Sequence, residues 1–177
     1  MDELLILKKS KLKPSPEILI PGSKSESNRL LILNSLYSNP IRIHNLSTAD
    51  DTRVMLNALN SDADLIDIGH AGTAMRFLTA YFSICENRKV MLTGSERMKQ
   101  RPIGILVDAL NALGADISYV EKEGFPPLKI NGKKFYKNKI ELAAGISSQF
   151  VSALMLIAPK LENGLNIRLK DQPTSKP

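Results

Sequence analysis

Residues 69–83 read GHAGTAMRFLTAYFS, a loop of small residues that runs directly into an apolar helix. Two more stretches have the same form: GSKSESNRLLILNSL at residues 22–36 and AGISSQFVSALMLIA at residues 144–158. All three carry hydroxyl residues where the helix begins, and such residues cap the free N–H groups of a helix start. The helices are apolar on much of their circumference, so we expect them to be buried. Because their sequence identity is low, the three stretches are only weak evidence for a duplicated unit.

Around these helices, short apolar or alternating runs predict strands. The expected strands are residues 41–46, 65–68, 90–92, 117–120, 128–130, 139–142 and 165–169. Asp50 and Asp51 open a further helix, since acidic residues are favoured in a first turn. Pro102 fits the first turn of another helix, which ends near Gly114. The fold class is therefore α/β with central helices. A plain doubly wound sheet would instead have strands as its most apolar elements.

Composition narrows the class of function. The 177 residues are 43% hydrophobic and 24% charged, as in ordinary globular proteins. The net charge is +6, but the basic residues are scattered rather than gathered in a block. Aromatic residues make up 5% and Trp is absent, which disfavours a stacking platform for single-stranded nucleic acid. A solvated basic surface or a site for a small polyanion explains the charge better, and a basic RNA-binding module remains the alternative.

The location predicted from the sequence is the cytoplasm. Cys85 is the single cysteine, so an internal disulfide or a cysteine zinc site is excluded, which suits a reducing compartment. The first ten residues do not resemble a secretory signal. No apolar stretch approaches the roughly 20 residues that a membrane span requires. His44 and His70 lack metal-ligand spacing, so no metal is expected.

Four loops, each before a helix, carry residues suited to anion binding. They are residues 22–29, 69–76, 95–102 and 147–149. Free N–H groups at a helix start bind anions, and arginine grips a phosphate or carboxylate with two parallel bonds. Taken singly, each loop has a simpler explanation as a helix cap, a tight turn or a basic surface. If they converge, they form a cationic pocket for a phosphorylated, carboxylated small molecule.

An ordered series of motifs resembles the 5-enolpyruvylshikimate-3-phosphate synthase family. The matching segments are PGSKS and SNR at 21–25 and 27–29, ADDTRVM at 49–55, GTAMRF at 72–77, GSERM at 94–98, RPIG at 101–104, SSQF at 147–150 and SKP at 175–177. They follow the family order over nearly the whole chain. The resemblance implies an inside-out α/β fold of repeated βαβαββ-type units, the enolpyruvyl transferase fold, present here in part.

The implied activity is transfer of the enolpyruvyl group of phosphoenolpyruvate to the 5-hydroxyl of shikimate 3-phosphate, with release of phosphate. This reaction belongs to the shikimate pathway, which leads to chorismate and the aromatic amino acids. It requires no cofactor, and its partners are the two small substrates. The family resemblance further implies a monomer that contacts neither nucleic acid nor a membrane.

The resemblance also implies roles for individual residues. Lys24 would contact both substrates and stabilise developing negative charge. The implied shikimate 3-phosphate site consists of Lys24, Ser25, Arg29, Ser147, Ser148, Gln149 and Ser175. The implied phosphoenolpyruvate site consists of Lys24, Gly72 and Arg101.

Two departures from the family pattern affect the expected function. His70 stands where the family usually has Asn, which would change phosphoenolpyruvate geometry or make the loop sensitive to pH. The acid/base residue of the family lies in a second half that has no counterpart here, so we expect no activity from this chain alone. Residues 1–20 would pack with that second domain, and residues 21–177 would form most of the shikimate 3-phosphate domain. The related UDP-N-acetylglucosamine enolpyruvyl transferase is an alternative, although the cysteine typical of its loop is missing from residues 96–101.

Overall fold

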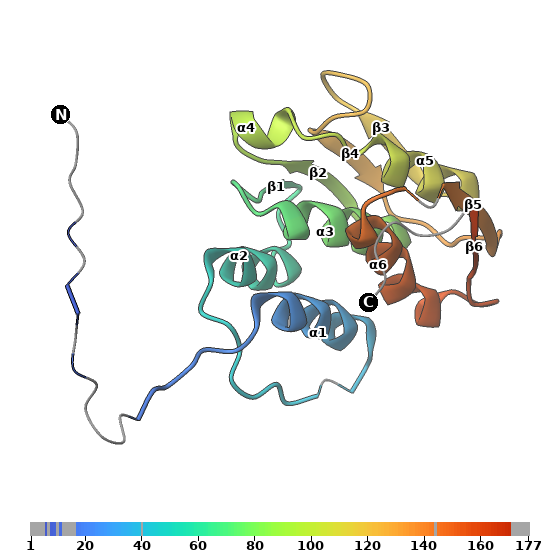
Figure 1. Ribbon diagram of the computed structural model, residues 1–177. Coiled ribbons are helices and arrows are strands. Elements are labelled where there is room, and N and C mark those ends of the chain that lie inside the picture. The colour runs from blue at the N-terminus through green and yellow to red at the C-terminus, as the bar shows by residue number, and fades with distance from the viewer. Residues whose placement is uncertain are drawn as a thin grey trace.

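Three helices lie together in the computed structural model (Figure 1), which describes residues 6, 8–9, 11, 17–39, 41–143 and 145–170. They are α1 (Lys24–Leu36), α3 (Gly72–Ile84) and α6 (Ser148–Ile157), and each packs against the other two. The helix α2 (Asp50–Leu59) begins at the predicted acidic pair and packs on α1 and α3. Every helix predicted from a loop–helix stretch is thus confirmed.

The helix α3 belongs to one complete βαβαββ unit. It runs through β1 (Leu65–Asp67), α3, β2 (Lys89–Thr93), the short α4 (Glu96–Lys99), α5 (Gly104–Leu113), β3 (Asp116–Tyr119) and β4 (Leu128–Asn131). The strands form one sheet in the order β1-β2-β4-β3. β1 and β2 are parallel, whereas β4 is antiparallel to both of its neighbours.

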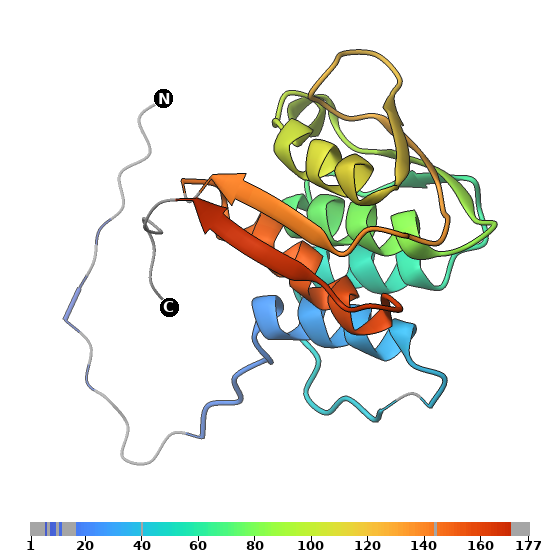
Figure 2. The same ribbon diagram turned by 90° about the vertical axis from the view of Figure 1, so that its right-hand side faces the viewer.

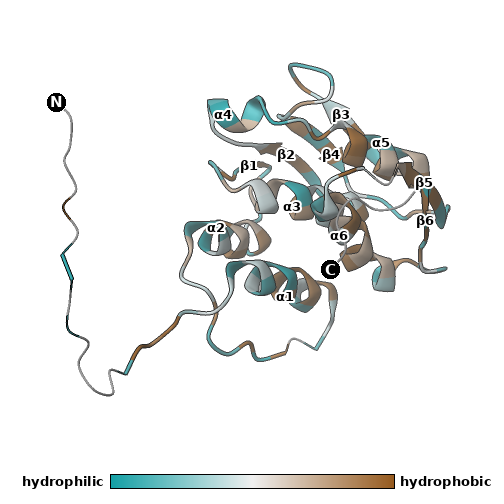
Figure 3. Ribbon diagram, viewed as in Figure 1, coloured by the Kyte–Doolittle hydropathy of each residue, from teal (hydrophilic) through white to brown (hydrophobic). Residues whose placement is uncertain are grey.

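The sheet buries only one face. Ile66 pairs in register with Leu92, and Val90 with Ile130, and all four side chains are buried. On the other face Met91 is 40% exposed. The helices α3 and α5 contact the sheet, and hydropathy colouring shows the apolar residues concentrated in these inner helices and the strands behind them (Figure 3). Helices inside and a one-sided sheet outside are the inside-out arrangement expected from the sequence.

A second, smaller sheet lies beside α6. The parallel strands β5 (Lys139–Ala143) and β6 (Asn166–Lys170) run side by side across the front of the molecule in Figure 2. The chain passes from one to the other through α6 and the 3₁₀ turn Ala158–Lys160. This β–α–β segment repeats the strand–helix–strand start of the larger unit, which supports the duplication suspected from the sequence.

Three local predictions were wrong. Residues 41–46 form no strand, because Asn45 adopts a positive φ of 53° that interrupts an extended run, and no described strand pairs with them. Pro102 does not lie in the first turn of α5, which starts two residues later at Gly104. Within residues 95–102, which were expected to form a loop, Glu96–Lys99 form the helix α4. The predicted end of α5 is correct, since Gly114 caps it at φ 114°.

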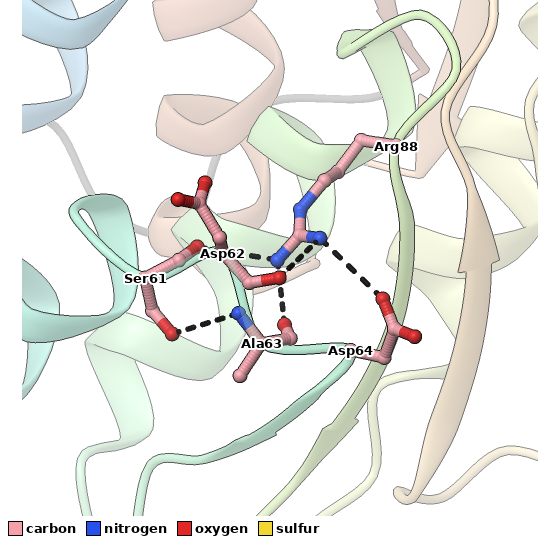
Figure 4. A network of polar contacts seen from close by, with 5 residues as sticks. All are labelled: Ser61, Asp62, Ala63, Asp64 and Arg88. Atoms are coloured by element: carbon pink, nitrogen blue, oxygen red, sulfur yellow. Dashed lines mark hydrogen bonds and ion pairs between the residues drawn. The ribbon is translucent and has the colours of Figure 1, made fainter.

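Arg88 ties the turn after α3 to the segment that precedes β1 (Figure 4). Its guanidinium donates to the carbonyl oxygens of Asp62 at 2.9 Å and Ser61 at 3.2 Å, and also to that of Ala63. It lies 3.5 Å from the carboxylate of Asp64 as well. One arginine thereby satisfies several backbone carbonyls of an irregular segment.

Among the described helices, none has the length and apolar character needed to cross a membrane.

The close approach of α3 and β4 yields a stability prediction. A β-carbon on Gly132 would overlap the carbonyl oxygen of Cys85, a backbone atom that cannot move aside. We therefore expect Gly132→Ala to lower the free energy of unfolding by about 1–3 kcal/mol, the usual cost of overpacking. Urea denaturation followed by circular dichroism measures this change.

The matched control is Gly145→Ala, because a β-carbon there has no neighbour within 4 Å. That variant should stay within about 0.5 kcal/mol of the parent chain. Equal stability of the two variants would contradict the packing described at Gly132.

Candidate functional site

The first turns of α1, α3 and α6 meet in one region. Arg29 in α1 lies 3.5 Å from the hydroxyl of Ser152 in α6, and its guanidinium lies 5.5 Å from the ring centre of Phe77 in α3. Arg76 in α3 in turn lies 5.4 Å from the ring centre of Phe150 in α6. All five residues belong to the first two turns of their helices, so the three helices point their N-terminal ends the same way.

The α1 entrance places the predicted cations beside α2. Ser23 caps the helix by accepting from the N–H of Glu26 at 3.4 Å. Lys24 is the first helical residue, and its ammonium group lies 3.6 Å from the carboxylate of Asp51. The Arg29 guanidinium donates to the carbonyl of Ser25 at 2.8 Å, which holds it against its own helix. Lys24 and Ser25 remain exposed to solvent and therefore accessible to a ligand.

The α6 entrance contributes hydroxyl and amide groups. Ser147 caps α6 by accepting from the N–H of Gln149 at 3.4 Å, and Ser148 is the first residue of the helix. The side chains of Ser147 and Ser148 are exposed. Arg29 reaches this helix through Ser152, so the predicted α1 and α6 site residues lie in one neighbourhood. Ser175 lies outside the described residues.

A cationic cavity opens at the start of α3. It has a volume of about 420 Å³ and is lined by His70, Arg97, Met98 and Arg101. Arg101 packs directly over Gly72, where a β-carbon would overlap its guanidinium. α3 begins without a side-chain cap, so its first N–H groups are left for another acceptor. The predicted pair Gly72 and Arg101 is thus brought together beside a cavity of the size that holds a small ligand.

Arg76 adds positive charge behind this cavity. It donates to the carbonyl of Gly72 at 2.7 Å, while its buried Nε has no partner among the described residues. Burial, and secondly the positive charge of Arg101, lower the pKa of the Arg76 guanidinium. Like charges gathered in a half-buried site repel one another, and a bound anion would relieve that repulsion.

His70 joins the cavity wall to α4. Its Nδ1 lies 2.8 Å from the hydroxyl oxygen of Ser95, and the same oxygen accepts from the N–H of Met98 at 3.3 Å to cap α4. Which of the two groups donates depends on the tautomer of the ring. His70 itself is exposed.

Sequence reasoning did not single out several residues of this region. The position of Asp51 predicts only a helix start, yet its carboxylate also pairs with Lys24. Phe77 and Phe150 are buried aromatic rings under two arginines, and a pattern of apolar residues does not distinguish them from ordinary core. Ser152 could have been found, because it lies one helical turn after Ser148 on the same face.

Cys85 takes no part in the site. It follows the last turn of α3, at the opposite end from Gly72 and roughly 20 Å away along the helix axis. Its thiol lies 3.2 Å from the carbonyl oxygen of Tyr81, and burial raises its pKa. A half-buried thiol that resists ionisation is a poor nucleophile.

Fold and site together define a mixed α/β protein with a cationic pocket at the N-terminal ends of buried helices. The family model described as EPSP synthase (3-phosphoshikimate 1-carboxyvinyltransferase) matches residues 9–61 and 59–177. The chain therefore belongs to the EPSP synthase family, as the motifs predicted.

Relatives and solved structures agree with this assignment. A 3-phosphoshikimate 1-carboxyvinyltransferase from Bacteroides fragilis strain YCH46 is 51% identical over 160 residues, which cover 90% of this chain and 39% of the relative. One from Shewanella loihica is 43% identical, with 89% of this chain and 43% of the relative covered. The EPSP synthase structure from Acinetobacter baumannii has a TM-score of 0.75 at 20% identity, covering 89% of this chain and 41% of that one. The chain thus spans about two fifths of the proteins it matches.

The contact between Gly72 and Arg101 leads to a binding prediction. In Gly72→Ala, the new methyl group must push the Arg101 guanidinium away from the helix start, and a flexible side chain can move without unfolding the protein. We expect affinity for inorganic phosphate to fall about tenfold, the loss of roughly one charge-assisted hydrogen bond. Isothermal titration calorimetry measures it, with Gly145→Ala as the matched control. Unchanged phosphate affinity in Gly72→Ala would exclude Arg101 from anion binding.

Proposed function

We propose that this chain supplies the shikimate 3-phosphate-binding part of a 3-phosphoshikimate 1-carboxyvinyltransferase. The proposed reaction joins C2 of phosphoenolpyruvate to the 5-hydroxyl oxygen of shikimate 3-phosphate, which gives up its proton, and then breaks the bond from C2 to the phosphate oxygen, so that phosphate leaves. A proton is added to the methylene carbon in the first step and removed in the second. The relatives that carry this name match the chain along about 90% of its length.

The observation that carries the proposal is the meeting of the α1 and α6 entrances. Arg29 contacts both helices, through the carbonyl of Ser25 in α1 and the hydroxyl of Ser152 in α6. The starts of these two helices carry exposed serines. Guanidinium, hydroxyl and helix N–H groups are the donors that bind phosphate. We assign shikimate 3-phosphate to Lys24, Ser25, Arg29, Ser147, Ser148, Gln149 and Ser175, with the serines largely around its phosphate.

Phosphoenolpyruvate is assigned to the neighbouring cavity at the start of α3. Arg101 over Gly72 offers a bidentate cation next to uncapped helix N–H groups. Lys24 is the proposed catalytic residue, because an ammonium group between the two anions would stabilise the charge that develops in the addition step. Its contact with Asp51 at 3.6 Å keeps the ammonium at the α1 entrance.

The division of the chain belongs to the same proposal. Residues 21–177 would form most of one substrate-binding domain, and residues 1–20 would pack against a second domain. The apolar run Ile18, Leu19 and Ile20 supports this, with exposed fractions of 74%, 91% and 75%. We further infer a monomer in the cytoplasm, which binds small substrates and neither nucleic acid nor membrane. The single cysteine is consistent with that compartment.

The alternative acceptor, UDP-N-acetylglucosamine, has less support. The segment from Glu96 to Arg101 carries no cysteine, and Cys85 lies at the far end of α3. Turnover assays with each acceptor, on a protein that contains this chain together with a second domain, distinguish shikimate 3-phosphate from UDP-N-acetylglucosamine as the substrate. An RNA-binding module would instead bind RNA at moderate salt and tolerate Lys24→Ala, whereas purely electrostatic binding falls steeply with salt.

Binding of shikimate 3-phosphate tests the proposal directly. We expect saturable binding to this chain in a calorimetric titration, and a loss of at least about tenfold in Arg29→Ala, because hydrogen bonds to a charged group are strong. Arg53→Ala is the matched control, since Arg53 is exposed on α2 and, among the described residues, pairs with Asp50 alone, at 2.8 Å. Both variants are checked for folding by circular dichroism.

Equal binding by the parent chain and Arg29→Ala would contradict the assigned site. Loss of binding in Arg53→Ala would show that net charge, rather than the pocket, holds the ligand. No binding by the parent chain would show that the pocket requires residues beyond those present here.

Turnover provides a second test. We expect the 177-residue chain to release no phosphate from shikimate 3-phosphate and phosphoenolpyruvate, because the acid/base residue of the family pattern has no counterpart in it. A continuous phosphate-release assay measures this. Turnover by the purified chain that Lys24→Ala abolishes would overturn the expectation.

A further inference from the structure

His70 shares the cavity wall at the start of α3 with two arginines. The cavity holds about 420 Å³, and its lining includes His70, Arg97 and Arg101 with no carboxylate among the described residues. From this geometry we propose that protonated His70 is a third cationic ligand of the anion in this cavity, so that anion affinity rises as pH falls. The inference rests on the proposed function, because it concerns the cavity assigned to phosphoenolpyruvate.

The hydrogen bond to Ser95 determines which ring nitrogen of His70 can contact a ligand. Nδ1 lies 2.8 Å from the Ser95 hydroxyl oxygen, which leaves Nε2 as the nitrogen for a ligand. In neutral His70 only one ring nitrogen carries a proton, so the ring offers an anion at most one donor and no charge. In protonated His70 both nitrogens donate, Nδ1 to Ser95 and Nε2 to the anion. Among side chains, histidine is the one suited to change charge between about pH 5 and 8.

The carboxylates near His70 already have partners, which favours a bound anion as the partner of the protonated ring. In its own loop, the Asp67 carboxylate accepts from the N–H of Gly69 at 2.8 Å. From α4, Glu96 pairs with Lys99 at 3.2 Å, and Lys99 also pairs with Glu121 at 3.1 Å. These carboxylates therefore have partners of their own.

The remaining facing groups are the cations Arg97 and Arg101, with Arg76 behind them. An anion bound in the cavity would be attracted both by these arginines and by a protonated His70 ring. Protonation and anion binding are thus linked, and each strengthens the other by the same factor.

Sulfate is the probe for this linkage, because it keeps its double negative charge across the range of titration and phosphate does not. The chain has two histidines, His44 and His70, so imidazole NMR signals can be followed for both. In the 177-residue chain, we expect saturating sulfate to move the midpoint of the His70 titration to higher pH. His44, in the exposed segment at 41–46, should titrate alike with and without sulfate.

Sulfate affinity itself gives the second readout. It should be about fivefold higher near pH 5.5 than near pH 8 in the parent chain, the lower end of usual coupling between sites. In His70→Asn, the dependence on pH should vanish, while His44→Asn should behave as the parent chain does. Arg101→Ala should weaken sulfate binding at every pH.

The outcomes separate this inference from the function on which it rests. Sulfate binding that Arg101→Ala weakens but that ignores pH would overturn the role of His70 and leave the anion cavity in place. The same dependence on pH in His70→Asn would also overturn it. Failure of sulfate to bind at any pH would sink both this inference and the assignment of an anion to the cavity.

Discussion

Two arginines held over aromatic rings connect the helices on which the rest of the molecule depends. Arg29 of α1 lies over Phe77 of α3, and Arg76 of α3 lies over Phe150 of α6. A guanidinium attracted to a ring face can be packed close to apolar neighbours without a carboxylate partner. Within the part of the chain that the structure describes, neither arginine pairs with a carboxylate, so both charges are available to an anion.

The one-sided sheet explains why such a helix cluster exists. Strands β1 to β4 bury a single face, so the second layer of the fold has to be helical. α3, with Phe77 and Leu78 fully buried, is enclosed by sheet on one side and by α1 and α6 on the other. Because the helices are the core and point their starts the same way, their unsatisfied N–H groups gather at one end of the molecule.

The absence of a side chain at Gly72 lets Arg101 come close to the start of α3. A serine or threonine cap would have occupied the same N–H groups, as Ser23 does in α1 and Ser147 does in α6. The α3 entrance has neither, and it is here that the cavity with His70 and Arg97 opens. Local helix chemistry thus distinguishes two entrances capped by serine from one whose first N–H groups have no side-chain cap.

The sequence by itself determined the starts of α1, α2, α3 and α6, the end of α5 at Gly114 and most strands, because caps and hydrophobic spacing act over a few residues. Motif order also identified the family. The segment at 41–46 failed as a strand because pairing needs a partner that alternation of residues cannot supply. Only the tertiary structure brought His70 to Arg101, Asp51 to Lys24 and Arg29 to Phe77. Those contacts join separate helices and loops, and their geometry follows from packing of the whole core.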